Sequence, residues 1–132
     1  MNKKLIHTLR RISFKEQLFF FERLSFLLRA NVPLLKSLSI LENQGKSALM
    51  KELVGKVISE LSNGQSFWRS LEHYQDIFGS FSVNIIRVGE ESGMLSKNLE
   101  YLSQYQKKRH IFIVISLSSE LSNGGCHLKK TC

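Results

Sequence analysis

Apolar residues recur at helical spacing from residue 14 onward, directly after a helix-start signal. Ser13 and Glu16 have the spacing of a capping box, in which each side chain accepts a hydrogen bond from the other residue's backbone N–H. The apolar stripe that follows is too wide for a helix with one buried seam, so burial on two sides is expected. The pattern predicts a helix to about Ala30, ended by Asn31 in the left-handed conformation.

Five more helices follow the same period of about 3.6 residues, up to about residue 109. Pro33 is expected at the first position of the second helix, where its missing N–H costs nothing. Ser47 opens the third helix, and Ser66 is expected to cap a short fourth one. The fifth and sixth helices flank a break at residues 89–93. The residues predicted to face inward are Phe81, Ile85 and Val88 in the fifth helix, and Leu95, Leu99, Leu102 and Tyr105 in the sixth.

These elements predict an all-α fold, a six-helix bundle of short antiparallel helices over residues 13–109, because no segment alternates apolar and polar residues as a strand does. Residues 1–12 are a basic N-terminal segment. Residues 110–132 are an atypical tail, in which the β-branched run at residues 111–115 has no helical period. We expect this tail to be disordered. No segment reaches the roughly 20 apolar residues that a membrane-spanning helix needs, so a complete transmembrane helix is not expected.

The net charge of +8 is concentrated at both ends of the chain. Residues 1–15 hold five basic residues and no acid, and residues 107–132 hold five basic residues and one acid. The body between them, residues 16–106, holds nine bases against ten acids. A nucleic-acid-binding domain usually carries its basic excess on its folded body. Basic ends around a neutral body instead favour a domain close to an anionic membrane, and a small basic helical nucleic-acid-binding protein is the alternative.

No set of residues has the spacing of a catalytic or metal site. The one adjacent pair of carboxylates is Glu90 and Glu91, and neighbouring helical side chains point about 100° apart, which rarely suits one reacting atom. The tail offers Cys126, His127 and Cys132, one ligand short of a tetrahedral zinc site. We therefore expect no catalytic, cofactor-binding or metal-binding residues and no enzymatic activity, with contact of Glu90 or Glu91 to a cation or a partner left open.

Three short motifs occur in order along the chain. Residues 26–38 read FLLRANVPLLKSL, residues 62–67 read SNGQSF, and residues 87–95 read RVGEESGML. Together they resemble the motifs of the type II secretion system protein F family, which includes the platform proteins of type IV pili and competence pili. The matching motif residues are Pro33, Leu34, Gly64, Ser66, Gly89, Glu90, Ser92, Gly93 and Leu95.

Each motif has a structural explanation. Gly89 and Gly93 are expected to allow a close approach between helices and a chain reversal. Glu90 is expected near the start of the last helix, where unsatisfied N–H groups favour a carboxylate. Asn31 stands where the family usually has Gly, a replacement that a left-handed turn tolerates.

The resemblance implies a non-enzymatic scaffold domain at the cytoplasmic face of the bacterial inner membrane, part of a platform on which an assembly ATPase adds or removes pilin-like subunits. The implied partners are that ATPase, other platform subunits, further copies of the chain and the membrane surface, without nucleic acid or cofactor. Members of the family continue into a long apolar helix after this domain. Because no such helix follows His110, the resemblance predicts a truncated or frame-shifted copy.

The first helix carries more phenylalanine than one small bundle is expected to bury. Large exposed apolar patches usually mark interaction sites. Phe19, Phe20 and Phe26 are therefore candidate interface residues, together with Glu91. The alternative is that all the phenylalanines of this helix belong to the core.

Overall fold

The structure is a computed structural model that describes residues 12–131, and the side chains of residues 12–121. In this part of the chain all regular structure is helical, which confirms the all-α prediction, but seven helices are present where six were predicted. The additional helix is the single turn α6. The helices are α2 (Phe14–Arg29), α3 (Leu34–Gln44), α4 (Ala48–Ser62), α5 (Phe67–Glu72), α6 (Gln75–Phe78), α7 (Ser80–Ser92) and α8 (Leu95–Thr131).

Two sequence predictions concern residues that the structure does not describe. The basic N-terminal segment, apart from the buried Ile12, lies outside the described residues. The side chains of Cys126, His127 and Cys132 lie outside them as well.

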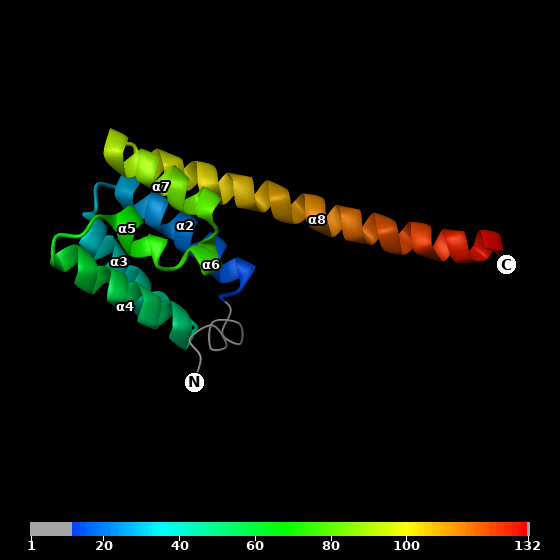
Figure 1. Cartoon of the computed structure of the whole chain (residues 1–132), viewed down its shortest axis with the longest axis horizontal. Coiled ribbons are helices and arrows are strands. Elements are labelled where there is room, and N and C mark those ends of the chain that lie inside the picture. The colour runs from blue at the N-terminus through cyan, green and yellow to red at the C-terminus, as the bar shows by residue number, and fades with distance from the viewer. Residues whose placement is uncertain (1–11, 132) are drawn as a thin grey trace.

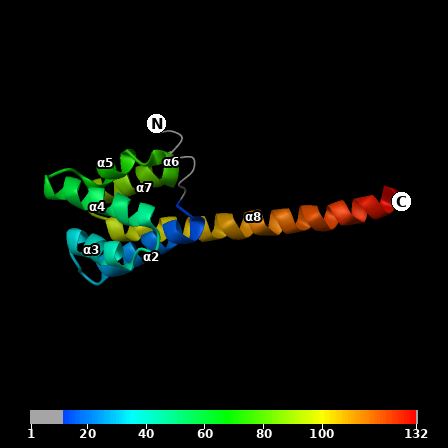
Figure 2. The ribbon, with the colours of Figure 1, turned by 90° about the horizontal axis from the view of Figure 1, so that it is seen from below.

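Six helices form a ring around one apolar core (Figures 1 and 2). α2 packs against α3 and α8, α8 against α7, α7 against α5, α5 against α4, and α4 against α3, while α6 packs against α5 and α7. α2 and α8 run antiparallel, because Arg29 pairs with Glu100 and Glu22 pairs with Lys107. The largest fully buried side chains are Phe21, Leu24, Leu38, Leu53, Val54, Val57, Phe67, Leu71, Ile86, Leu99 and Leu102.

Local signals set the helix ends, as the sequence predicts. Ser13 Oγ accepts from the Glu16 N–H at 3.2 Å, and the Glu16 carboxylate accepts from the Ser13 N–H at 3.3 Å, which confirms the capping box. Three helices end on a left-handed residue, Asn31 (φ 62°), Gly64 (φ 91°) or Gly93 (φ 74°). After each, two backbone hydrogen bonds reach back to the last turn in the Schellman pattern, so the reversals are closed without side chains.

The inward face of α7 differs from the prediction. Val83 and Ile86 are buried, whereas Phe81 and Val88 are 44% and 56% exposed. The reason is Gly89, which lies against α8: a Cβ placed on it would be 2.9 Å from the Cβ of Asn98. The buried face of α7 therefore consists of Ser82, Val83, Ile86 and Gly89. Ile85 is half-buried against the core, as predicted, whereas Phe81 and Val88 lie outside this face.

The last helix also differs from the prediction, because α8 does not end near residue 109. It is 37 residues long in total, from Leu95 to Thr131, and extends well beyond the bundle, as Figures 1 and 2 show. Extending an existing helix by one residue costs far less than starting one, and residues 110–123 contain neither Gly nor Pro to interrupt it. The structure thus places residues 110–131 in the continuation of α8, where the sequence pattern predicts an atypical tail. All side chains from residue 107 to residue 121 are exposed, and no helix in the described part of the chain has both the length and the apolar content needed to cross a bilayer.

Candidate partner interface

Glu90 joins two helices. It lies in the last turn of α7, and its carboxylate reaches the N-terminus of α5, where Oε1 accepts from the Phe67 N–H and Oε2 from the Trp68 N–H, both at 2.8 Å. These N–H groups have no partner within their own helix, and a negative charge there is favoured by the helix dipole. The prediction that Glu90 serves the start of the last helix is therefore wrong: it serves the start of α5.

Ser66 occupies the N-cap position of α5, but its side chain makes no capping hydrogen bond. The bidentate carboxylate of Glu90 supplies that cap instead. The second and third sequence motifs thus meet in space, because Phe67 belongs to the second and Glu90 to the third. This contact spans more than 20 residues of sequence, so local spacing gives no sign of it.

Asn98 is a structural residue that sequence reasoning missed. Its Nδ2 donates to the Ile85 carbonyl oxygen at 2.9 Å, and its side chain lies against Gly89. The sequence does offer one sign of it, because Asn98 is a polar residue directly beside Leu99, which the pattern assigns to the apolar face of the last helix. Asn98 and Gly89 together fix how closely α7 and α8 approach.

The remaining motif residues also hold turns and helix ends. Pro33 lies at the N-cap of α3, one position earlier than predicted, and the half-buried Leu34 begins that helix and packs on the core. Ser92 Oγ donates to the Gly89 carbonyl oxygen at 3.4 Å, and the half-buried Leu95 begins α8. With the exception of the Ser66 side chain, these motif residues therefore lie at a turn or helix end or make a contact within the domain.

Glu91 behaves differently from its neighbour Glu90. It is exposed and pairs with Arg87, 3.5 Å away, one turn earlier in α7. The guanidinium groups of Arg87 and Arg69 both lie over the ring of Trp68, at 5.4 and 5.1 Å from its centroid. Within the described residues, no three His, Cys, Asp or Glu side chains are grouped so that they could hold a metal ion.

Among the titratable side chains that the structure describes, Tyr74 is the one with a clearly shifted pKa. Burial raises the pKa of its phenol because the charged form is poorly solvated there, while nearby Lys56 acts in the opposite direction. A raised pKa keeps the hydroxyl protonated near neutral pH. Tyr74 is therefore not a ready base or nucleophile.

The phenylalanines of α2 divide into two groups. Phe20 and Phe21 are 2% and 0% exposed and lie with Phe78 in one aromatic cluster, with ring centroids 5.6 to 5.8 Å apart. The proposal of Phe20 as an interface residue is therefore wrong, because it belongs to the core. Phe19 and Phe26, in contrast, are 43% and 56% exposed.

The exposed phenylalanines line a groove of about 350 Å³ between α2 and α8, which we call the α2/α8 groove. Two ion pairs cross it, Arg29 with Glu100 at 3.1 Å and Glu22 with Lys107. A further bond, from Ser25 Oγ to the Ser96 carbonyl oxygen at 2.8 Å, ties α2 to the first turn of α8. The lining residues are Phe19, Glu22, Arg23, Ser25, Phe26, Arg29, Glu100, Ser103, Gln104 and Lys107.

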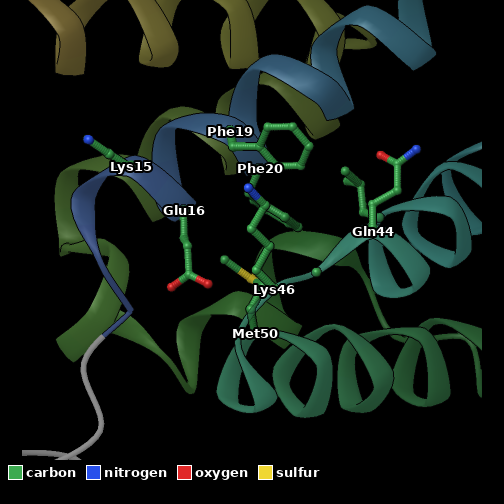
Figure 3. Close-up of a pocket in the computed structure, with 9 residues that line it drawn as sticks. Lys15, Glu16, Phe19, Phe20, Gln44, Lys46 and Met50 are labelled. Carbon is green, nitrogen blue, oxygen red and sulfur yellow. The ribbon is translucent and has the colours of Figure 1, made fainter.

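Phe19 also borders a second hollow, shown in Figure 3. This pocket of about 270 Å³ lies between α2 and the link from α3 to α4. Phe20 and Met50 give it an apolar wall, and the charged residues Lys15 and Lys46 belong to its lining. Phe19 thus lines both surface depressions.

Comparison with known proteins identifies relatives of the helical domain. Residues 20–112 match the sequence model of the family described as type II secretion system (T2SS), protein F. The chain is 32% identical over 94 residues to the type IV pilus assembly protein PilC of Thermus thermophilus, covering 71% of this chain and 23% of that protein. It is 30% identical over 90 residues to the type 4 fimbrial assembly protein PilC of Pseudomonas putida, covering 68% and 22%.

A third relative is the type IV pilus assembly protein TapC of Aeromonas hydrophila, 27% identical over 86 residues and covering 65% of this chain and 21% of TapC. The chain thus spans less than a quarter of the length of these curated relatives. The matched region begins in α2 and ends in α8, and it contains the three motifs and, apart from Phe19, the residues that line the α2/α8 groove. This chain belongs to the type II secretion system protein F family.

Proposed function

We propose that this domain is a non-enzymatic scaffold module of an assembly platform that serves type II secretion, type IV pilus or competence-pilus machinery. The family match over residues 20–112 carries this proposal, with the support of relatives named as pilus assembly proteins. In the proposed role the domain contacts the assembly ATPase and other platform subunits, and it associates with further copies of itself.

The use of the polar residues supports a scaffold. Both oxygens of Glu90 accept backbone hydrogen bonds, so this carboxylate is committed to capping α5. Glu91 pairs with Arg87 at the surface, and the phenol of Tyr74 stays protonated. Catalysis needs a nucleophile, acid or base positioned beside others. Glu90 and Glu91 instead make separate contacts, Glu90 with backbone N–H groups of α5 and Glu91 with Arg87.

The proposed location is the cytoplasmic face of the inner membrane. Lys107, Lys108 and Arg109 are exposed where α8 leaves the bundle, and the apolar residues 111–115 follow them directly. Basic residues beside an anionic membrane are worth about 1 kcal/mol each. This order of charge followed by apolar surface supports a domain held close to a bilayer.

The test is direct binding between the 132-residue chain and two purified candidates from the same organism, the assembly ATPase and a cytoplasmic domain of another platform subunit. Titration calorimetry is expected to show saturable binding to at least one of them. The matched variants are Phe26→Ser and Val88→Ser, since both wild-type side chains are 56% exposed and only Phe26 lines the groove.

Phe26→Ser is expected to weaken binding, and Val88→Ser to leave it unchanged. Light scattering is expected to show self-association of the wild type at high concentration. A wild type that stays monomeric and binds neither candidate would contradict the scaffold proposal.

A further inference from the structure

The α2/α8 groove has an uneven distribution of charge. Glu22 is paired with Lys107, and Glu100 is paired with Arg29, so both acids on the groove wall are already neutralised. Arg23 is exposed and lies over the ring of Phe19, 5.8 Å from its centroid. Among the residues that the structure describes, Arg23 has no carboxylate partner. The groove therefore presents one unneutralised cation.

Apolar side chains stand on both sides of this cation. Phe19 and Phe26 are two helical turns apart on α2, a separation of about 10 Å, and Arg23 lies between them on the same face. Both phenylalanines are exposed although each could bury a large area in a contact. The surface thus offers an apolar, cationic and apolar contact in sequence along one helix.

We infer that the α2/α8 groove docks a helical segment of a protein partner that presents one carboxylate between two apolar side chains. On such a helix, apolar residues at i and i+7 with an Asp or Glu at i+3 or i+4 reproduce the spacing of Phe19, Arg23 and Phe26. The carboxylate meets Arg23, and the apolar side chains cover the two phenylalanine rings. The inference rests on the proposed function, because it names the chemistry of the partner that a scaffold would hold.

A second copy of this chain does not fit the groove. In a two-fold contact the same surface meets itself, so Arg23 would face a wall whose two carboxylates are already paired with Arg29 and Lys107. Like charges would then approach each other in a partly desolvated contact, which costs affinity. The occupant is therefore a different and locally acidic segment.

The probes are two synthetic helical peptides of equal length, built on Ala and Gln. Both carry Leu at i and i+7. The acidic peptide has Glu at i+4 and the basic peptide has Lys there. Each is titrated into the isotopically labelled 132-residue chain while backbone amide signals are followed by NMR. The acidic peptide is expected to shift amides of α2 and of the facing turns of α8.

Charge reversal provides the discriminating variant. Arg23→Glu is expected to weaken binding of the acidic peptide about tenfold and to make the basic peptide the better ligand. Lys51→Glu, which makes the same change in net charge on an exposed position of α4, is expected to change binding less than about twofold. Amide spectra of both variants confirm that the exposed substitutions leave the fold intact.

Several results would overturn the inference. They are equal binding of the two peptides, an equal loss of acidic-peptide binding in Lys51→Glu, absence of amide shifts in α2, or self-association of the wild type that Arg23→Glu abolishes. The last result would identify a second copy as the occupant.

The docking inference and the proposed function can fail independently. If the ATPase and platform subunit bind both wild type and Arg23→Glu equally, the docking inference fails and the scaffold proposal stands. If the acidic peptide binds as expected while neither protein does, the scaffold proposal fails.

Discussion

Removal of the Glu90 carboxylate should destabilise the domain far more than the removal of its neighbour. In Glu90→Ala, the N–H groups of Phe67 and Trp68 lose both acceptors at the start of α5. Phe67 is fully buried, so water reaches its N–H poorly and does not replace the carboxylate easily. A hydrogen bond to a charged group contributes about 1.5–3 kcal/mol, and loss of a helix cap costs about 0.5–2 kcal/mol.

Because the two bonds share one side chain, their contributions do not simply add, and we expect a loss of about 2–3 kcal/mol in the free energy of unfolding. Glu90→Gln keeps one carbonyl acceptor without the charge and should lose about 1 kcal/mol. The control is Glu91→Ala, next in sequence and exposed, whose surface pair with Arg87 is worth less than about 0.5 kcal/mol.

Urea unfolding followed by far-UV circular dichroism measures these differences as shifts in midpoint at constant slope. In a thermal scan the Glu90→Ala loss corresponds to a drop of roughly 8–12 °C for a domain of this size. Equal and small effects at Glu90 and Glu91 would show that the carboxylate does not cap α5. A Glu90→Gln variant as stable as the wild type would show that the charge contributes nothing.

Three further predictions concern packing and the extended helix, and urea unfolding checks each of them. Gly89→Ala should lower the free energy of unfolding by about 1–2 kcal/mol, because the clash of the new Cβ with Asn98 outweighs the gain in helix propensity. An increase in stability would refute the close approach of α7 and α8. Phe20→Ala should lower the free energy of unfolding by about 3–5 kcal/mol, whereas Phe19→Ala should lower it by less than about 1 kcal/mol. Equal losses would contradict the assignment of Phe20 to the core and Phe19 to the surface. Deleting residues 111–132 should change the free energy of unfolding by less than about 0.5 kcal/mol, because the described side chains in that segment are exposed. The helical circular dichroism signal should fall. A loss of several kcal/mol would mean that these side chains pack on the bundle.

The features that the sequence predicts correctly are those decided within one or two helical turns. The capping box at Ser13 and Glu16 and the left-handed turns at Asn31 and Gly93 depend only on residues next to them, so their types and spacing are sufficient.

The features that the sequence does not predict depend on contacts between distant segments. Nothing local indicates that Glu90 reaches the N-terminus of α5, or that Asn98 lies on Gly89 and so turns the face of α7. The consecutive phenylalanines 19–21 point in directions about 100° apart, and only the packing of neighbouring helices decides which of them is exposed.

Because α8 is one continuous helix, a movement of its part in the groove wall also moves its far end. Between Leu95 and Asn123 the sequence of α8 contains neither Pro nor Gly, the usual places where a helix bends sharply. The stretch from Ser103 in the groove wall to Asn123 is a rod of about 30 Å, so a tilt of about 5° at the groove moves its end by about 3 Å. A change in the width of the α2/α8 groove therefore displaces the far end of α8. A force applied to that far end would, in turn, change the width of the groove.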